Sequence, residues 1–374
     1  MNYNMAYNQI KHVLSAFRFE GRYSRAEELH SGNVNNTYHL YYALPGGGCA
    51  EYVLQQINTY AFKKPDEVMS NIVRVTEYLR GVLAEAGEDS ENRVLTCIPT
   101  VTGEFMFRDD QNRYWRAYRY IHDAVAYDRV EKPEHFYEAG RAFGEFQRMF
   151  GGFPVNELYD TIPNFHDTRK RFYTFVASVA EDRAHRVAEL DSEIDFFFDR
   201  RKMMSEIVRK IESHEIPLRV THNDTKINNI MLDAQTGRAV CVIDLDTVMA
   251  GSALYDYGDA IRYGASTADE DEPDTSKIDL NMDLFREFTR GFLSEVGDLL
   301  TEAELKCLPL SLKVMTCELA MRFLTDYIDG DVYFKVNSPD HNLIRAHAQM
   351  KLLERIEEKY DQICAITEEI IRNR

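Results

Sequence analysis

The residues best suited to chemistry in this chain are His222, Asp224, Asn229, Asp244 and Asp246. Asn229 follows Asp224 by five residues, and a later apolar run ends in Asp244-Leu-Asp246. In phosphoryl transfer, one carboxylate orients and deprotonates a hydroxyl, while an amide and a second carboxylate hold a metal ion on nucleotide phosphates. The types and spacing of these residues therefore indicate a phosphoryl-transfer site.

Each half of this pattern has a plainer interpretation. His-x-Asp alone is a common sequence, and Asp-x-Asp also occurs in metal-dependent glycosyltransferases or simply at the end of a strand. Both together, in this order and separation, favour phosphoryl transfer. Such a reaction depends mostly on positioning and charge compensation, so the elements that carry the two halves matter.

Short strands are predicted to position these residues. Residues 218–220 read as a strand that enters the loop of Asp224. Residues 230–233 and 239–243 read as a hairpin, because the turn-forming sequence Ala-Gln-Thr-Gly separates two apolar runs. The hairpin would carry the chain from Asn229 to Asp244.

The first third of the chain predicts a small, β-rich lobe. Apolar residues at helical spacing predict helices over residues 1–20 and 65–84. The glycines of Pro45-Gly-Gly-Gly48 are interpreted as a hairpin turn, since a strand is predicted on each side. Five strands are predicted, at residues 24–29, 36–44, 51–57, 94–99 and 114–121.

The loop over residues 31–37 is the candidate for approach to phosphates or substrate. Gly32, Asn33, Asn35 and Thr37 are small or amide-bearing residues that allow a ligand to lie close to the backbone. The same residue types mark ordinary turns, so both interpretations stay open.

The rest of the chain is predicted to be mainly helical, with helices near 136–149, 194–212, 283–297, 302–328 and 342–371. Residues 120–126 read either as a hinge, whose backbone at Tyr120 and Ile121 could meet an adenine edge, or as a plain linker. We therefore predict an α+β, two-lobed fold, with an N-terminal nucleotide-binding lobe at 1–121 and a larger C-terminal lobe at 122–374.

The composition restricts the partners. The chain has 374 residues, 44% of them hydrophobic, and a formal net charge of −18. Such an acidic protein is not expected to bind nucleic acid or an anionic membrane nonspecifically. The six cysteines are dispersed without a CxxC pair, which favours reduced thiols. No signal peptide or membrane span is evident, so we expect a cytoplasmic protein, with a monomer favoured.

Two motifs resemble those of the aminoglycoside phosphotransferase and choline kinase superfamily, which shares the protein-kinase fold. Residues 221–229 resemble its catalytic loop, and residues 243–251, continuing through Asp256 and Asp259, resemble its metal-binding motif. Within that superfamily the chain is most similar to the N-acetylhexosamine 1-kinases. That narrower resemblance rests on residues 32–38, 52–56, 165–168, 261–267, 321–327 and 330–334.

The resemblance implies ATP-dependent phosphorylation of the anomeric hydroxyl of an N-acetylhexosamine, with Mg²⁺, giving the sugar 1-phosphate and ADP. Asp224 would be the base, and Asn229 and Asp244 would bind magnesium. Asp246 would be a secondary metal ligand or a group behind the first ligands. The implied nucleotide contacts are Gly32, Asn35, Thr37, Gln55, Gln56, Tyr120 and Ile121.

On the sugar side, the resemblance implies contacts from Asn33, Asn223, Arg322 and Tyr333. The chain departs from many kinases of this fold at Gln55 and Gln56, where a strand lysine usually meets the phosphates. The family can also carry histidine at the position of Asn33, which leaves the preferred hexosamine open.

Plainer roles remain for some of these residues. Arg322 could be a structural ion-pair partner, and Asp167, beside His166, could simply cap a helix. Three other functions also remain open. They are a kinase for another small hydroxyl compound such as an amino alcohol or aminoglycoside, a nucleotide-binding pseudokinase, and a glycosyltransferase that uses Asp244-x-Asp246.

Overall fold

The structure is a computed structural model that describes residue 7, residues 10–29 and residues 34–374. The chain forms two compact units. The first contains residues up to 124 together with 156–162 and 240–249, and the second contains 125–155, 163–239 and 250–374. The functional boundary predicted after residue 121 stays a prediction, but the structure adds that the segment with Asp244 and Asp246 belongs to the first unit.

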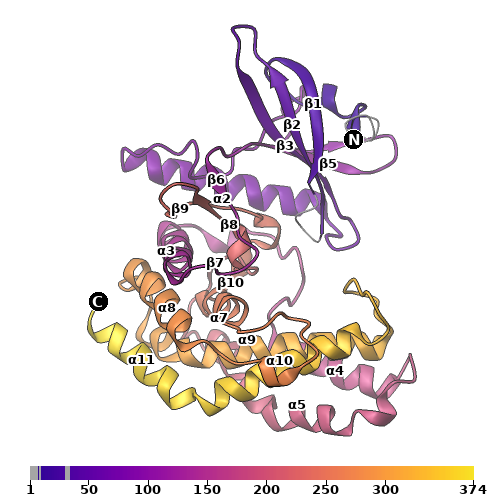
Figure 1. Cartoon of the computed structure of the whole chain (residues 1–374), viewed down its shortest axis with the longest axis vertical. Coiled ribbons are helices and arrows are strands. Elements are labelled where there is room, and N and C mark those ends of the chain that lie inside the picture. Colours follow the sequence, from indigo (N-terminus) through magenta and orange to yellow (C-terminus); the bar gives the residue numbers. More distant parts are fainter. Residues whose placement is uncertain (1–6, 8–9, 30–33) are drawn as a thin grey trace. The chain divides into compact units, whose positions relative to one another are not determined.

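An antiparallel sheet of five strands dominates the first unit, in the order β1-β2-β3-β5-β4 (Figure 1). Its β2–β3 turn is the predicted glycine hairpin, in which Gly47 and Gly48 have φ angles of 89° and 90°. The strands are β1 (Arg22–Leu29), β2 (Asn36–Ala43), β3 (Cys49–Ile57), β4 (Phe107–Arg108) and β5 (Tyr114–Arg119).

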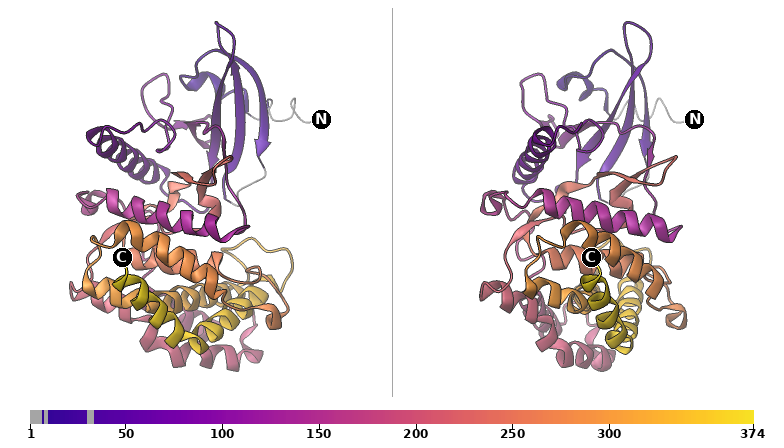
Figure 2. Two further views of the ribbon diagram at one scale, coloured as in Figure 1. Left: turned by 60° about the vertical axis from the view of Figure 1, so that its left-hand side comes forward. Right: turned by 90° about the vertical axis from the view of Figure 1, so that its left-hand side faces the viewer.

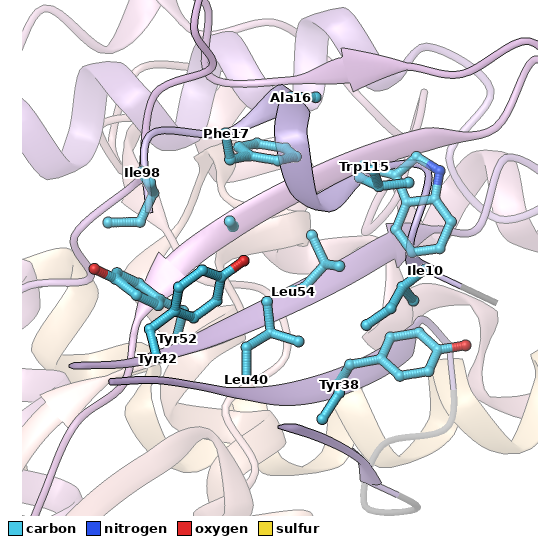
Figure 3. Close-up of a cluster of buried hydrophobic side chains, with 13 residues drawn as sticks. Ile10, Ala16, Phe17, Tyr38, Leu40, Tyr42, Tyr52, Leu54, Ile98 and Trp115 are labelled. Carbon is cyan, nitrogen blue, oxygen red and sulfur yellow. The ribbon is translucent and has the colours of Figure 1, made fainter. Parts of the chain in front are cut away.

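The two faces of this sheet carry different residues. One face packs into a hydrophobic core that includes Tyr38, Leu54 and Trp115 (Figure 3). Because side chains alternate along a strand, the neighbouring residues Thr37, Gln55 and Arg116 point to the opposite face. Thr37 pairs with Gln55 across β2 and β3, and Gln55 pairs with Arg116 across β3 and β5. The register therefore lines up these three polar residues.

Helix α2 (Pro65–Glu85) is the predicted helix of this unit. Its stripe of Val68, Ile72, Val75 and Leu79 is buried, as the helical spacing indicates. Asn71 of α2 is fully buried, and its Nδ2 donates to the carbonyl oxygens of Tyr159 and Val248 at 2.9 Å each. The helix thus anchors both of the short segments that the first unit takes from later in the sequence.

The structure bears out one prediction for this unit only in part and contradicts another. Among the described residues of the predicted helix 1–20, Tyr7 and Ile10 are helical, and the backbone N–H of Lys11 donates to the carbonyl oxygen of Tyr7 at 2.8 Å. A 3₁₀ turn, Leu14–Ala16, follows and Phe17 is extended, so the predicted helix ended too late. Residues 94–99 make only an isolated bridge to β5, between Cys97 and Tyr118. The fifth strand is instead β4.

Asp109 closes the turn between β4 and β5. Its Oδ2 accepts hydrogen bonds from Trp115 Nε1 at 2.9 Å and Arg113 Nε at 2.8 Å, and His12 Nε2 lies 3.0 Å away. Burial raises the pKa of this carboxyl, but hydrogen bonds from His12, Arg113 and Trp115 outweigh burial and hold the pKa well below its usual range. Asp109 is therefore an ionised anchor of the sheet.

Helices make up most of the second unit (Figure 2). They are α3 (Pro133–Met149), α4 (Thr168–Glu181), α5 (Asp191–Met204), α6 (Glu206–Glu212), α7 (Ala253–Gly264), α8 (Met282–Val296), α9 (Glu302–Asp329), α10 (His341–Glu358) and α11 (Tyr360–Arg372). The remaining short strands of the chain are β6 (Ala124–Val125), β7 (Arg219–Thr221), β8 (Ile230–Asp233), β9 (Ala239–Val242) and β10 (Met249–Gly251). The predicted α+β class is confirmed.

Most predicted helices of this unit are confirmed, but two are divided. The predicted helix 194–212 breaks at Ser205, and the predicted helix 342–371 breaks at Lys359. Helix α4 was anticipated only as the helix that Asp167 could cap, and helix α7 was not predicted. Helix α7 is almost entirely buried, and its buried residues include the polar Asp256, Asp259 and Arg262.

Helices α3 and α8 approach each other closely at glycines. A Cβ on Gly291 would lie 2.0 Å from the carbonyl oxygen of Tyr137, and a Cβ on Gly140 would lie 2.3 Å from that of Phe288. These distances leave no room for any side chain, so both glycines are required by backbone contact. Over the described part of the chain, no helix combines the length and apolar character needed to cross a membrane.

Candidate active site

The loop of Asp224 is held between firmly anchored elements of the second unit. The predicted strand before it is β7, one residue later than expected. Arg219 of β7 makes a salt bridge to Glu304, whose side chain is fully buried, with Nε 2.7 Å from Oε1. After the loop, a 3₁₀ turn, Ile227–Asn229, leads into β8 of the predicted hairpin. The loop therefore enters and leaves through fixed backbone.

Two carboxylates of the buried helix α7 accept hydrogen bonds from the backbone of this loop. Asp256 accepts hydrogen bonds from the backbone N–H of His222 at 2.9 Å and of Asn223 at 2.8 Å. Asp259 accepts one from the backbone N–H of Thr225 at 3.2 Å. Burial raises the pKa of Asp256, and His222 and the hydrogen-bond donors partly offset this effect. Asp256 and Asp259, which continue the predicted metal-binding motif, therefore fix the backbone of the predicted catalytic loop.

Asn223 has a left-handed backbone, with φ of 63°. This conformation is uncommon outside glycine, although asparagine tolerates it better than most residues. Its side chain is buried and donates to the carbonyl oxygen of Thr221 at 3.3 Å. The implied contact of Asn223 with substrate stays a prediction.

Asp224 presents a partly exposed carboxylate beside two neighbours from its own loop. Asn229 Nδ2 donates to Asp224 Oδ2 at 3.1 Å and to the Asp224 carbonyl oxygen at 2.7 Å. Lys226 Nζ lies 3.1 Å from Asp224 Oδ1. The structure therefore brings together the predicted base and the predicted amide ligand.

Lys226 was not among the residues predicted for the site. Asp224 is the main cause that raises the pKa of Lys226 above its ordinary value, and Glu270 and Asp259 add to the effect. A permanently charged ammonium group beside the candidate base can meet phosphate oxygens or hold the carboxylate in place. Its position two residues after Asp224 was the available signal.

Asp244 and Asp246 differ sharply in exposure, although both belong to the first unit. Asp244 is exposed and has a left-handed backbone, with φ of 58° and ψ of 58°. Asp246 is 3% exposed and follows in a 3₁₀ turn, Leu245–Thr247. Its carboxylate forms a buried ion pair with Arg116 of β5. Sequence reasoning missed Arg116, since one arginine inside a strand carries no distinctive pattern.

The predicted nucleotide contacts of the first unit are largely bonded to one another. Gln55 Nε2 donates to Thr37 Oγ1 at 3.2 Å, and Gln55 Oε1 accepts from Arg116 Nε at 3.0 Å. Asn35 Nδ2 donates to Asp246 Oδ2 at 2.7 Å. Gln56 accepts a bond from Asn36 at 3.3 Å on the exposed side. The predicted contacts Gly32 and Asn33 lie outside the described residues.

The segment after β5 carries the remaining predicted nucleotide contacts. The ring of Tyr120 stacks on His39 of β2, with centroids 4.0 Å apart and planes 8° apart, and its backbone N–H donates to Glu51. Ile121 is 9% exposed. Burial lowers the pKa of His39, and its hydrogen bond with Glu51 partly offsets this effect. A nucleotide contact from Tyr120 and Ile121 stays a prediction.

Two of the predicted sugar contacts in the second unit, Arg322 and Tyr333, lie close together. The Arg322 guanidinium carbon lies 5.8 Å from the ring centroid of Tyr333, 5.0 Å from Phe165 and 5.6 Å from Phe334. Arg322 Nη1 lies 3.8 Å from Glu318 Oε1, a distance for an ion pair but not for a hydrogen bond. Both interpretations of Arg322, as a sugar contact and as an ion-pair partner, therefore have a structural basis.

The plainer interpretation of Asp167 is confirmed. Its side chain caps α4 by accepting a hydrogen bond from the backbone N–H of Lys170 at 3.0 Å. Its neighbour His166 is buried, with Nδ1 3.0 Å from Glu318 Oε2. Although burial raises the pKa of Glu318, the charges of His166, Arg322 and Arg171 outweigh it and lower that pKa.

Asp326 of α9 is a further residue that sequence reasoning missed. Its Oδ1 accepts hydrogen bonds from the backbone N–H groups of Val332 and Tyr333 at 2.9 and 2.7 Å, and its Oδ2 accepts one from Phe334 at 2.9 Å. This buried carboxylate therefore fixes the backbone of residues 332–334. Tyr333 in this loop is 49% exposed. These hydrogen bonds could not be predicted from the sequence, because the partners of Asp326 are backbone groups.

Residues 25–286 match the phosphotransferase enzyme family APH. This match includes well over half of the chain, together with the loop of Asp224 and the segment of Asp244 and Asp246. The chain therefore belongs to the APH phosphotransferase family.

Solved structures with the same fold include kinases of several small molecules. An aminopropanol kinase associated with a microcompartment matches with a TM-score of 0.58 and 13% identity, over 96% of this chain and 98% of that one. An amicoumacin kinase in complex with AMP-PNP and Ca²⁺ matches with a TM-score of 0.58 and 14% identity, over 94% and 93%. The choline kinase of Cryptosporidium parvum matches with a TM-score of 0.56 and 13% identity, over 94% of both chains. The predicted kinase-like fold is confirmed.

Proposed function

We propose that this phosphotransferase uses ATP and Mg²⁺ to phosphorylate the anomeric hydroxyl of an N-acetylhexosamine, N-acetylglucosamine or N-acetylgalactosamine. The observation that carries the proposal is the cluster around Arg322. Three sequence segments that resemble the sugar kinases, at 165–168, 321–327 and 330–334, supply its arginine and its aromatic rings. A guanidinium donor beside aromatic faces suits a ligand with many oxygen acceptors and apolar ring faces.

The charge of this cluster also favours a sugar over an amino alcohol or an aminoglycoside. Arg171 lies close enough to Arg322 that burial and the charge of Arg322 together lower the pKa of Arg171. Glu318, the nearby carboxylate, is already engaged by His166. A cationic substrate placed against these aromatic rings would meet the guanidinium of Arg322, whereas a neutral sugar with hydroxyl and carbonyl oxygens would not be repelled.

The loop of Asp224 supplies the proposed chemistry. Asp224 would accept the proton of the anomeric hydroxyl as that oxygen attacks the γ-phosphorus, and ADP would leave. Asn229 holds the Asp224 carboxylate in position through Oδ2. Lys226 is proposed to stabilise negative charge on the transferred group, because its ammonium lies beside the base.

The donor set of the chain fits a magnesium ion. Mg²⁺ prefers hard oxygen ligands and is usually bound through one or two carboxylates together with phosphates. Asp244 offers an exposed carboxylate, and the amide of Asn229 offers a carbonyl oxygen. When bound, the ion would neutralise charge on the nucleotide phosphates. The proposed contacts to nucleotide or sugar remain those predicted from the sequence, namely Gly32, Asn33, Asn35, Thr37, Gln55, Gln56, Tyr120 and Ile121.

A substrate panel tests the reaction. The panel would contain both N-acetylhexosamines, glucose, choline, ethanolamine and an aminoglycoside, each with ATP and Mg²⁺, and phosphorus NMR would locate the phosphate. We expect a hexosamine 1-phosphate as the main product. Phosphate on the 6-hydroxyl, or equal turnover of choline and hexosamine, would contradict the proposal.

Two substitutions test the residue roles. Asp224→Asn preserves shape but removes the proton acceptor, so kcat should fall about 10²–10⁴-fold while ATP binding persists. Arg322→Ala should raise the KM for the sugar far more than the KM for ATP. The exposed Arg183→Ala serves as the control for loss of a cation and should leave both KM values unchanged. Normal turnover by Asp224→Asn would exclude it as the base.

A further inference from the structure

A chain of buried polar contacts crosses the first unit and ends at the segment of Asp244. Arg116 of β5 is 1% exposed. Its Nη1 forms the ion pair with Asp246 Oδ1, and its Nε donates to Gln55 Oε1 at 3.0 Å. Many kinases of this fold have a lysine on the strand that here carries Gln55. Here a buried cation, Arg116, lies instead on the neighbouring strand and faces a carboxylate of the predicted metal motif.

The other oxygen of Asp246 is engaged as well. Oδ2 accepts the hydrogen bond from Asn35 Nδ2 at 2.7 Å, and Asn35 Oδ1 in turn accepts one from the backbone N–H of Asn58 at 2.9 Å. The side chain of Asp246 is only 4% exposed. A metal ion would therefore have to displace a charged partner and enter a closed site to reach this carboxylate.

The backbone around Asp244 needs such anchors. A left-handed conformation at a residue other than glycine is unfavourable, and it persists only where the surroundings fix it. Two residues later, Asp246 is held by Arg116 and Asn35. Four residues later, the carbonyl oxygen of Val248 accepts the hydrogen bond from the buried Asn71 of α2. Asp244 itself is an exposed residue.

We propose that Asp246 is not a metal ligand but the anchor through which Arg116 and Asn35 position Asp244. Arg116 is then a positioning residue that replaces the missing strand lysine structurally, without touching the nucleotide. This inference rests on the proposed function only in taking Asp244 as the metal ligand. In this inference Asp244 binds the metal and Asp246 holds Asp244 in position, a division of roles that the sequence resemblance left open.

The two possible roles of Asp246 predict opposite effects of removing Arg116. If Asp246 binds the metal, Arg116 competes for its carboxylate, and Arg116→Met should strengthen metal binding. If Asp246 is the anchor, the same substitution frees the segment of Asp244 and should weaken metal binding. Removing one partner of a buried ion pair should also destabilise the protein when no metal is present.

The experiment combines two measurements on the full chain. The Tm in EDTA measures how far the contact between Arg116 and Asp246 stabilises the protein without metal. Calorimetric titration with Mg²⁺ and AMP-PNP measures metal-dependent nucleotide binding. We expect Arg116→Met to lower the Tm in EDTA by roughly 5–10 °C and to weaken Mg²⁺-dependent binding by at least ~10-fold. Arg119→Met, on the same strand but in an exposed ion pair with Glu91, should change neither quantity.

Further variants keep the test decisive if Arg116→Met folds poorly. Arg116→Lys retains the charge but cannot serve both Gln55 and Asp246, so its effects should be intermediate. The double variant Arg116→Met with Asp246→Leu replaces the buried pair by apolar groups and should regain much of the lost Tm. It should not regain metal binding, because the contact with Asn35 is also lost.

The outcomes separate this inference from the proposed function. An unchanged Tm with Arg116→Met, or tighter Mg²⁺-dependent binding, would overturn the anchor. Weak metal binding by Asp246→Asn with an unchanged Tm in EDTA would also overturn it and make Asp246 a ligand. If the native protein bound no Mg²⁺-AMP-PNP while the Tm pattern held, the proposed function would fail and the anchor would stand.

Discussion

Asp256→Asn tests whether the loop of Asp224 depends on the carboxylate beneath it. Asp256 Oδ2 accepts bonds from the His222 N–H and from Gln147 Nε2, and Oδ1 accepts one from the Asn223 N–H. An asparagine has one acceptor oxygen and one donor nitrogen. In either orientation, one of the two backbone N–H groups therefore loses its acceptor and faces another donor.

The magnitude follows from that single lost acceptor. Leaving one buried donor unsatisfied costs about 1–3 kcal/mol. Asp256→Ala leaves both N–H groups without their carboxylate, so it should cost about twice as much. The loop also contains the left-handed Asn223, which these bonds hold in place. A displacement of the loop by about 1 Å could lower kcat roughly 10²-fold.

The assay is urea unfolding followed by far-UV circular dichroism, together with kcat for the hexosamine. The matched control is Gln147→Leu, which removes a bond to the same carboxylate but leaves both backbone contacts intact. Gln147 Oε1 already lacks a partner within the described part of the chain, so its loss should cost less than about 1 kcal/mol. If Asp256→Asn were no more damaging than Gln147→Leu, the reasoning would be refuted.

Three further predictions concern other parts of the molecule. Gly291→Ala should destabilise the protein by several kcal/mol, on the order of an overpacked core, whereas Gly81→Ala in α2, with open space around it, should stabilise it by about 0.5–1 kcal/mol; thermal melting would show the opposite signs. Because the folded pKa of Asp109 is lowered, its stabilisation should be present above the unfolded aspartate pKa of about 3.9 and lost as the pH falls through the lower folded value. The Tm difference between native protein and Asp109→Asn should therefore shrink in acid, and a constant difference would contradict this. Asp326→Ala should free the loop of Tyr333 and raise the KM for sugar with little change in the KM for ATP; equal changes in both would argue against a local effect.

The sequence by itself determined the features that local patterns encode. Helical spacing located α2, α3, α8 and α9, and the glycine turn located the β2–β3 hairpin. The spacing of Asp224, Asn229 and Asp244 indicated phosphoryl transfer, and the family match confirms the phosphotransferase family. These signals are local because each depends on residues close together in the chain.

The tertiary structure decided what depends on contacts between distant segments. Arg116 is 130 residues from Asp246 in sequence, and neither residue alone predicts their pairing. The hydrogen bonds of Asp326 were hidden for a different reason, because its partners are backbone N–H groups, which any residue carries. The predicted helix 1–20 extended too far, because Phe17, after the 3₁₀ turn, is buried in the sheet core in an extended conformation. Local propensity thus selected the elements, whereas packing and burial chose the partners of their polar groups.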